Sequence, residues 1–401
     1  MVATVTSHTD TRNRAYAGEG FDGVVRVAVG GYYGTGVLLY DGHAVLTAAH
    51  LFTHGSTAAS VTFETTVGSQ TATASRVALQ PTYDATQGNN DLAIVWLSSS
   101  APVTAERYSL YRGSDEIGQS LTMVGYGLPG MGATGELTNY SGGPLRLKAS
   151  NQFDADAGTL KSGLGSAMSW TPMPGTQLIA DFDNGTTHQD ALGRLIIRPG
   201  TGLGQDEGLI TPGDSGGPAF ISGQVAGIAS YTASLVSGGV HPDIDSVSNS
   251  SFGEVAAWQR VSYYQQWIDQ SLRAQYTNAP TQPAQVQKAA TEGNSGTSYA
   301  YFLLQFTGVR SDPNQLLSVD YRTRDGSATA GEDYLAASGT LVLYPNENQA
   351  AIAVEIVGDY QAEPNETFYL DVTHPVGGSF GDGVVMLTAV RTIVNDDGAW
   401  L

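Results

Sequence analysis

Residues 213–218 read Gly213-Asp214-Ser215-Gly216-Gly217-Pro218, and this stretch decides the fold of the larger part of the chain. A serine hydroxyl is a weak nucleophile and needs a neighbouring base to react near neutral pH. Glycines on both sides let the backbone turn sharply and approach a substrate closely. The stretch therefore predicts a nucleophile on a tight turn, with the N–H groups of Gly213 and Ser215 directed at a developing oxyanion.

Two earlier motifs supply the partners that such a serine needs. Leu46-Thr47-Ala48-Ala49-His50 ends on a histidine, which suits a base near neutral pH. Asn90-Asp91-Leu92-Ala93-Ile94 places a carboxylate before an apolar run. A buried carboxylate holds the right tautomer of the histidine and stabilises its protonated form. Each residue alone has an ordinary structural explanation, but the three motifs together favour a hydrolase.

In these motifs the chain resembles the trypsin-like serine proteases, from about Gly20 to Leu272. The resemblance implies a double β-barrel, with His50 as general base, Asp91 as the acid that orients it and Ser215 as nucleophile. The enzyme would then be a serine endopeptidase acting on proteins or peptides, with no cofactor for the chemistry. An inactive protease fold used for adhesion or surface binding stays open as an alternative.

The start of the chain departs from the family pattern. Zymogens of the family gain activity when a cut frees an amine that pairs with the acid before the nucleophile, here Asp214. The usual Ile-Val-Gly-Gly start is absent. A cut after Arg14, or after Arg12, would free an amine at Ala15 or close to it. A flexible leader over residues 1–19 is the alternative hypothesis.

The specificity pocket is a second departure. The position that forms the pocket floor in the family holds Leu209, and Ser230-Tyr231-Thr232 resembles the segment along one wall. An apolar floor predicts cleavage after a small or medium apolar residue. Asp206 and Glu207 are close enough in sequence to supply a carboxylate instead, which would favour cleavage after a basic residue.

Short β-rich runs bounded by Gly, Asn or Asp indicate that residues 20–274 are mainly β. The one clear helical stripe runs over Glu254–Leu272, where Trp258, Val261, Tyr264, Ile268 and Leu272 recur every three or four residues. Segment 127–205 has no pattern that places its elements. Residues 275–285 are polar, contain two prolines and read as a linker.

Residues 286–397 alternate apolar and polar side chains, which is typical of a sandwich. Their motifs, such as Glu363-Pro364-Asn365-Glu366-Thr367-Phe368 and Ile393-Val394-Asn395-Asp396-Asp397, resemble a Calx-beta domain. The resemblance implies a seven-stranded immunoglobulin-like sandwich. The predicted order is a leader or propeptide remnant at 1–19, a protease domain at 20–274, the linker, and a Calx-beta domain at 286–401.

The resemblance also implies calcium at one end of the sandwich, because Ca²⁺ prefers six to eight hard oxygen ligands. The positions that carry over are Glu292, Asp333, Asp359, Glu363, Glu366, Asp396 and Asp397. Gly358 and Asn395 stand where strong binders often have acids, and a calcium-free acidic end is the alternative. Separately, Asp181-Phe182-Asp183-Asn184-Gly185 reads either as a calcium loop or as an Asx-rich turn.

The amino-acid composition limits the kinds of partner that this chain can have. The 401 residues carry 18 Lys and Arg against 38 Asp and Glu, a net charge of −20, so nucleic acid is not an expected partner. No apolar run is long enough to span a membrane. With no cysteine, disulfides and Cys-ligated zinc are excluded. We expect a secreted, bacterial enzyme whose second domain tethers it to a cell surface or matrix, or ties its stability or activity to calcium.

Overall fold

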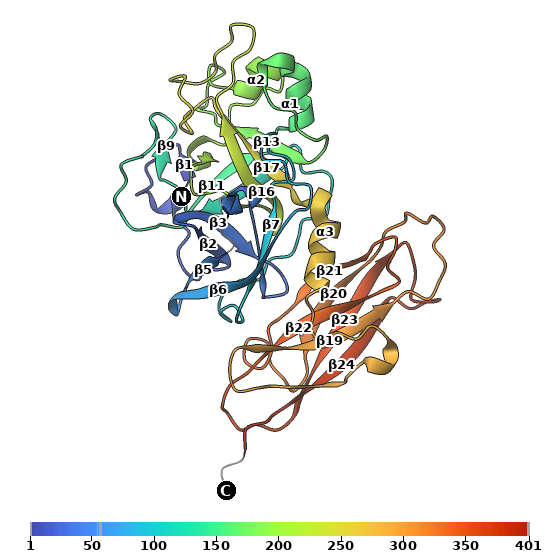
Figure 1. The fold of residues 1–401 in the computed structure, drawn as a ribbon. Coiled ribbons are helices and arrows are strands. Elements are labelled where there is room, and N and C mark those ends of the chain that lie inside the picture. Colours follow the sequence, from blue (N-terminus) through green and yellow to red (C-terminus); the bar gives the residue numbers. More distant parts are fainter. Residues whose placement is uncertain (1, 54, 56–57, 399–401) are drawn as a thin grey trace. The chain divides into compact units, whose positions relative to one another are not determined.

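The computed structural model describes residues 2–53, 55 and 58–398. The chain divides into two compact units. Unit 1 comprises Met1–Leu39, His43–Ser99 and Thr104–Gln265, and unit 2 comprises Tyr40–Gly42, Ser100–Val103 and Gln266–Leu401. Both units consist mainly of β-strands (Figure 1), which confirms the mainly-β prediction.

The first half of unit 1 is a closed six-stranded barrel. In barrel order its strands are β2 (Val24–Val29), β3 (Tyr32–Leu38), β4 (Ala44–Thr47), β7 (Ala93–Leu97), β6 (Gly68–Leu79) and β5 (Ala59–Thr65). Strands β4 and β7 are buried over their whole length, which explains why both read as continuous apolar runs. The short helix η2 (Ala49–Phe52) follows β4 directly.

The second half of unit 1 holds two further sheets. The larger has seven strands in the order β11 (Leu147–Gln152), β8 (Ser120–Gly125), β15 (Pro218–Ile221), β16 (Gln224–Ala233), β17 (Val255–Arg260), β13 (Gln177–Asp181) and β12 (Ala155–Asp156). The smaller has four, in the order β10 (Gly135–Glu136), β9 (Gly130–Met131), β1 (Val2–Thr4) and β14 (Gly208–Ile210). Leu178, Leu209 and Trp258 are among the buried residues of the core that these strands share.

Helices are few among the described residues. They are α1 (Ala157–Leu164), α2 (Ala191–Ile196), α3 (Val261–Arg273) and the short turns η1 (Thr11–Asn13), η2, η3 (Gly165–Ala167), η4 (Gly204–Asp206) and η5 (Pro283–Gln285). Helices α1 and α2 lie side by side (Figure 1), with Gly163 against the side chain of Ile196. Segment 127–205, which the sequence leaves unplaced, thus contributes β9–β13 as well as both of these helices.

The predicted helix over Glu254–Leu272 is wrong at its beginning. Val255–Arg260 is strand β17, which pairs antiparallel with both β13 and β16. Trp258 lies at helical spacing from Val261, yet it is fully buried within this central strand. An apolar run buried on both faces has no periodicity of its own, so its spacing to a following helix misleads.

Residues 2–19 are part of unit 1. Strand β1 pairs with β14 and β9, and Val2 and Ala3 have no exposed surface. The buried amide of Asn13 donates to Thr4 Oγ1 at 3.2 Å and to the Ser7 carbonyl at 3.0 Å. This segment is therefore held by strand pairing and by a side chain from its own turn.

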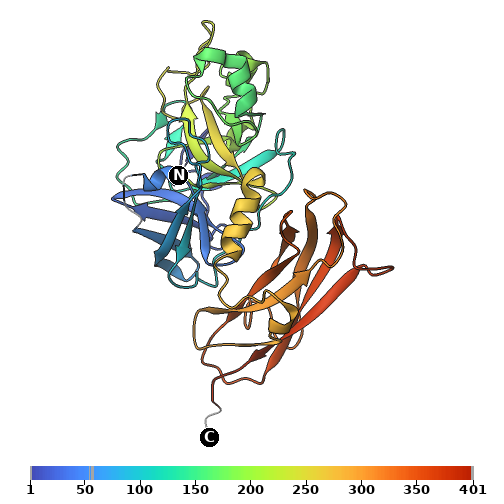
Figure 2. The same cartoon turned by 45° about the vertical axis from the view of Figure 1, so that its right-hand side comes forward.

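Unit 2 is a sandwich of seven strands. One sheet has the order β18 (Ala289–Thr291), β24 (Met386–Val394), β23 (Glu366–Val376), β20 (Leu317–Asp325) and β21 (Ser338–Leu343), and the other pairs β19 (Thr297–Gln305) with β22 (Gln349–Val357). Its core includes Phe302, Tyr334, Val354 and Phe368, with the Tyr334 and Phe368 rings stacked at 4.6 Å. The two layers can be followed in Figure 2.

Candidate active site

His50 lies in η2, the turn that leaves the buried strand β4. Its backbone N–H donates to Asp91 Oδ1 at 2.8 Å, and its ring Nδ1 lies 2.7 Å from Asp91 Oδ2. A carboxylate accepts hydrogen bonds and does not donate them, so Nδ1 carries the ring proton. The other ring nitrogen, Nε2, then keeps the lone pair that a general base needs.

Asp91 is 2 % exposed and well supplied with donors. Besides the two from His50, Oδ2 accepts from the Ser230 hydroxyl at 2.6 Å. The preceding residue, Asn90, has a left-handed backbone with φ 57°, and hydrogen bonds of its side chain hold this turn in place. Asn90 Oδ1 accepts from the Tyr264 hydroxyl at 2.8 Å, and its amide donates to the Thr82 carbonyl at 2.9 Å.

Ser215 occupies a tight turn between β14 and β15. Gly216 has φ +82°, and a Cβ there would lie 2.0 Å from Thr47 Oγ1 and 2.3 Å from the Thr35 carbonyl oxygen. Only glycine fits this position, because the turn packs directly on β3 and β4. The Thr35 N–H donates to the Ser215 carbonyl at 2.8 Å, so the turn is bonded to the barrel that carries His50.

Two backbone donors of the Ser215 turn, the N–H groups of Gly213 and Ser215, are candidates for binding an oxyanion. Within residues 2–53, 55 and 58–398, the N–H groups of Gly213 and Ser215 have no hydrogen-bond acceptor. Gly213 has φ +96°, and its carbonyl accepts from Thr35 Oγ1 at 2.9 Å, which fixes the orientation of the peptide. No hydrogen bond joins the Ser215 hydroxyl to His50 in the described part of the chain.

Asp214 is buried beneath the turn. Its carboxylate accepts from the N–H groups of Gly127 at 2.8 Å and Thr211 at 2.9 Å, and its burial raises its pKa. Ala15, the residue predicted to supply an activating amine, is held elsewhere: its N–H donates to the Arg146 carbonyl at 3.1 Å. In the uncut chain this N–H is therefore engaged by the Arg146 carbonyl, and activation by a cut after Arg14 stays a prediction.

The predicted pocket residues have different surroundings from those expected. Leu209 is fully buried in the core, where it pairs with Ala3, and offers no surface to a substrate. Ser230 contacts Asp91, as described above. The Tyr231 hydroxyl donates to Gln177 Oε1 at 2.7 Å and accepts from Trp170 Nε1 at 2.9 Å.

The two alternative acids do not line an open pocket either. Glu207 is 1 % exposed and accepts from the N–H groups of Asp183 and Leu203. Asp206 is exposed and lies 3.6 Å from Arg12 Nη1. Thr232 is half-buried in β16, opposite Ala256.

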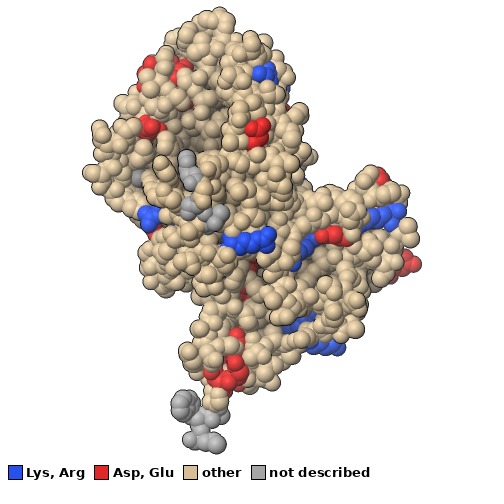
Figure 3. All heavy atoms as spheres, in the orientation of Figure 1, with Lys and Arg blue, Asp and Glu red and all other residues tan. Residues whose placement is uncertain are grey.

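Six of the seven predicted calcium ligands of unit 2 form two groups. In each group the carboxylates offer oxygens within 4.8 Å of one another; the groups are Glu292 with Asp359 and Asp397, and Asp333 with Glu363 and Glu366. The seventh, Asp396, accepts from the Gly293 N–H at 3.0 Å. Figure 3 shows carboxylates gathered at one end of unit 2.

The environment of these carboxylates fits a cation. Glu292 is 5 % exposed, and burial, followed by the charges of Asp359 and Glu363, raises its pKa. Burial, followed by Asp333, raises the pKa of Glu366 to about 7. Oδ2 of Asp397 is buried and has no hydrogen-bond partner in the described residues. Asn395 donates to Glu292 Oε2 at 3.2 Å, where another acid would add repulsion.

Ser230, which the sequence predicts on a wall of the specificity pocket, also donates to Asp91, a contact that sequence reasoning missed. Its partner, Asp91, is 139 positions away, and no local pattern connects them. Tyr264 and Asn90 were likewise missed as a supporting pair.

Among the helices of the described residues, none has the length and hydrophobicity that crossing a membrane requires.

Comparison with known proteins agrees with both resemblances. Residues 11–156 match the family described as Trypsin, and residues 303–397 match the Calx-beta domain. The Trypsin match includes His50 and Asp91 but ends before Ser215. Among solved structures, mouse neuropsin, a serine protease expressed in the limbic system of the brain, is 17 % identical over 63 % of this chain and 94 % of its own, with a TM-score of 0.45.

The curated relatives are ion exchangers. Human sodium/calcium exchanger 2 is 32 % identical over 155 residues, which cover 32 % of this chain and 17 % of the exchanger. Human sodium/calcium exchanger 3 is 41 % identical over 72 residues, 18 % of this chain and 8 % of its own length. The Drosophila melanogaster exchanger Calx is 32 % identical over 93 residues, with 22 % and 9 % coverage. The chain thus spans less than a fifth of each relative.

Proposed function

We propose that this chain, which carries a trypsin-like domain and a Calx-beta domain, is a serine endopeptidase that hydrolyses proteins or peptides. The observation that carries the proposal is the His50–Asp91 pair, with Nδ1 and Oδ2 2.7 Å apart. The glycine turn of Ser215, bonded to the same barrel, supports it. So do the unpaired N–H groups of Gly213 and Ser215.

In the proposed reaction, the Ser215 hydroxyl attacks the scissile carbonyl while His50 Nε2 takes its proton. The oxyanion that forms is stabilised by the N–H groups of Gly213 and Ser215. His50 then gives the proton to the leaving amine, and an acyl-enzyme on Ser215 is left. Water, deprotonated by His50, releases the acid product. Asp91 holds the Nδ1–H tautomer and balances the positive imidazolium.

For unit 2 we propose calcium binding by Glu292, Asp359 and Asp397, and by Asp333, Glu363 and Glu366. The two convergent carboxylate groups and the unpartnered oxygen of Asp397 support this. Two of the curated relatives of this chain are named sodium/calcium exchangers. Bound Ca²⁺ would neutralise the cluster and tie together the strand ends and loops that bear it. Millimolar calcium suits such sites, so secretion and tethering outside the cell belong to the same proposal.

Cleavage mapping tests the proposed activity. The full chain and its Ser215→Ala variant are incubated with an unfolded protein in calcium, and the new peptide ends are identified by mass spectrometry. We expect cuts that vanish in the variant. An apolar residue before each cut would bear out the predicted preference. Absence of any cut by the wild-type chain would contradict the proposal and favour the adhesion alternative.

A further inference from the structure

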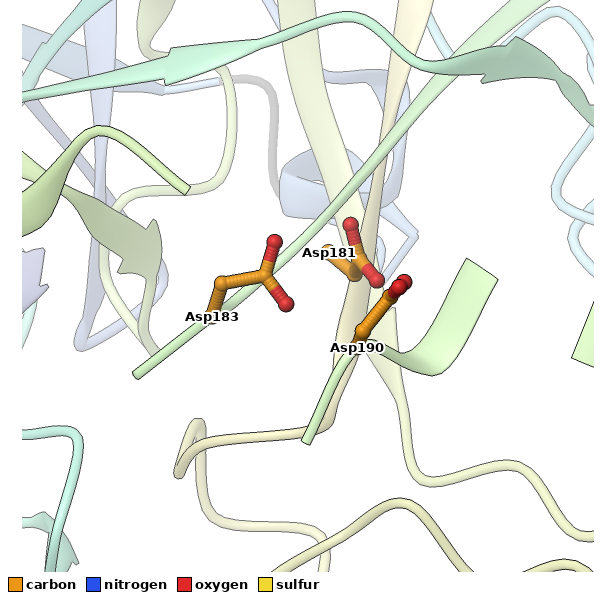
Figure 4. Close-up of side chains that lie close together, drawn as sticks. All are labelled: Asp181, Asp183 and Asp190. Atoms are coloured by element: carbon orange, nitrogen blue, oxygen red, sulfur yellow. The ribbon is translucent and has the colours of Figure 1, made fainter. Parts of the chain in front are cut away.

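A second group of acids lies inside unit 1, away from His50 and Ser215 in sequence. Asp181 ends strand β13, Asp183 follows two residues later, and Asp190 precedes helix α2. None of the three is more than 5 % exposed. Their carboxylates converge (Figure 4), and each offers an oxygen within 4.8 Å of the others.

One oxygen of this group has no partner. Asp183 Oδ1 is buried and has no hydrogen-bond donor among the residues described. Neither Lys nor Arg pairs with Asp181, Asp183 or Asp190 within the 4.0 Å limit of a salt bridge, again counting only described residues. A buried carboxylate oxygen without a donor or a cation is costly, so the fold leaves a charge uncompensated at this point.

Three of the other oxygens are oriented by backbone donors. Asp181 Oδ2 accepts from the Leu192 N–H at 2.7 Å. Asp190 caps α2 by accepting from the Gly193 N–H at 2.6 Å, and its other oxygen accepts from the Gly200 N–H at 3.2 Å. Each bonded oxygen retains a second lone pair. The carboxylates are thus held in place with acceptor capacity left over.

Two further acids border the group. Glu207 accepts from the Asp183 N–H at 2.7 Å, and Asp154 lies close enough to interact with both Asp181 and Glu207. Burial is the largest factor that raises the pKa of Asp183, and the negative charge of Asp181 follows. This agrees with the geometry, in which buried acids lie close together.

The donor set is oxygen only, which selects a hard cation, and several carboxylates at one point suit the coordination of Ca²⁺. We propose that Asp181, Asp183 and Asp190 bind one calcium ion inside unit 1, separate from the sites proposed for unit 2. The local Asp-Phe-Asp-Asn-Gly string is not the whole site, because Asn184 Oδ1 already accepts from the Thr186 N–H at 3.0 Å and from its hydroxyl at 2.6 Å. The third ligand, Asp190, is the residue that caps the N-terminus of α2.

Such an ion would fasten the long connection from β13 to β14. That connection carries α2, η4 and Glu207, and β14 leads directly to the turn of Ser215. The packing of α2 in its apolar cluster and the backbone bonds to these carboxylates also hold this connection, and the ion would add to them. The site itself does not depend on whether Ser215 is catalytic.

Hydrogen exchange with mass spectrometry on the full chain tests the site. Exchange of peptides within 182–207 is compared in calcium and in EDTA. A ligand that binds only the closed loop slows exchange by the factor of one plus its concentration over Kd, about 100-fold at 100 times Kd. Peptides from 286–397 report the proposed sites of unit 2 separately in the same run.

Two variants separate metal binding from general stability. Asp183→Asn removes the unpartnered charge, so we expect it to slow exchange in EDTA and to abolish the calcium response of 182–207. Asp190→Asn, which keeps a helix-capping side chain, is expected to lose the calcium response as well. The matched control is Asp206→Asn, an exposed acid on the same connection, which should respond like wild type.

The outcomes are distinct. A calcium response in wild type and Asp206→Asn, but in neither of the other variants, supports the site. Unchanged exchange of 182–207 in wild type would overturn it, as would an undiminished response in Asp183→Asn. Unaltered exchange of the β2–β7 barrel peptides in EDTA verifies that each variant is folded.

Discussion

Asp91 and Asp183 are both buried aspartates of unit 1, yet their surroundings differ. Asp91 receives three donors, two from His50 and one from Ser230. Asp183 has an oxygen with none, and other acids surround it. Burial alone therefore does not reveal what a carboxylate does. A well-partnered acid can orient a histidine, whereas the convergent acids around Asp183 are the basis of the proposed calcium site.

Asp22 is a third buried aspartate of unit 1, and its charge is compensated in another way. It is 1 % exposed, and Arg146 Nη2 lies 2.6 Å from its Oδ1. The Gly18 N–H donates to both of its oxygens, at 3.1 and 3.0 Å. Here the chain provides its own cation, and no external ion is needed. The three acids form a series that substitutions can test.

The largest effect is expected for Asp91→Asn. The amide nitrogen of Asn would favour the wrong tautomer of His50, so kcat should fall about 10⁴-fold with little change in stability. Steady-state kinetics on a peptide substrate measure this. Asp84→Asn, an exposed acid nearby, serves as control. A loss of less than tenfold in Asp91→Asn would mean that this acid does not orient the base.

Replacing Arg146, the cation that pairs with Asp22, tests how much this buried pair contributes to stability. Arg146→Met leaves a buried carboxylate uncompensated, which should lower the free energy of unfolding by about 3–5 kcal/mol. Arg12→Met breaks an exposed pair with Asp10, which solvent screens, and should cost much less. Urea unfolding compares the two. Equal losses would show that the Asp22–Arg146 pair is no more important than a surface pair.

Glu254 is a buried acid held by backbone donors, and its environment predicts how the free energy of unfolding depends on pH. It is fully buried, accepts from the N–H groups of Asn249 at 2.7 Å and Ser251 at 3.0 Å, and burial raises its pKa to about 7. The folded state therefore keeps a proton that the unfolded state loses near its ordinary pKa. The contribution of Glu254 to the free energy of unfolding should fall as pH rises from about 4.5 to 7, by at most about 3 kcal/mol.

Glu254→Gln removes this titration and keeps an acceptor for the two N–H groups. Urea unfolding at pH 5 and pH 8 should show a smaller decrease in stability for the variant than for wild type. The same decrease in both proteins would place the pH dependence elsewhere.

The smallest effect is expected for Ser230→Ala. Loss of one of three donors to Asp91 should loosen the orientation of His50 and lower kcat about tenfold, with KM unchanged. Ser230→Thr retains the hydroxyl and should recover most of the rate. A change in KM alone would instead return Ser230 to the substrate pocket, where the sequence placed it.

Local motifs explain what could be predicted. The glycines around Ser215 and the apolar strands beside His50 and Asp91 are contiguous in sequence, so the turn and the barrel strands follow from short-range patterns. The sandwich of unit 2 was predicted for the same reason, from period-two strands and acidic loop motifs.

The other features could not be predicted, because they depend on contacts between residues that lie far apart in the sequence. Ser230 reaches Asp91 and Arg146 reaches Asp22 only through sheet topology, which no spacing encodes. Asp181 and Asp183 were recognised as a candidate calcium loop, but Asp190 and Glu207 join them through the path of a long connection. Leu209 was assigned to a pocket floor by position, yet the pairing of β14 with β1 turns it into the core.

Covalent labelling of Ser215 tests the central claim most directly. The full chain is treated with a fluorophosphonate, a probe that reacts with activated serine, and the modified peptide is identified by mass spectrometry. We expect one adduct on Ser215, which is absent in Ser215→Ala and strongly reduced in His50→Ala. No adduct on Ser215, or equal labelling when His50 is replaced, would contradict a serine endopeptidase.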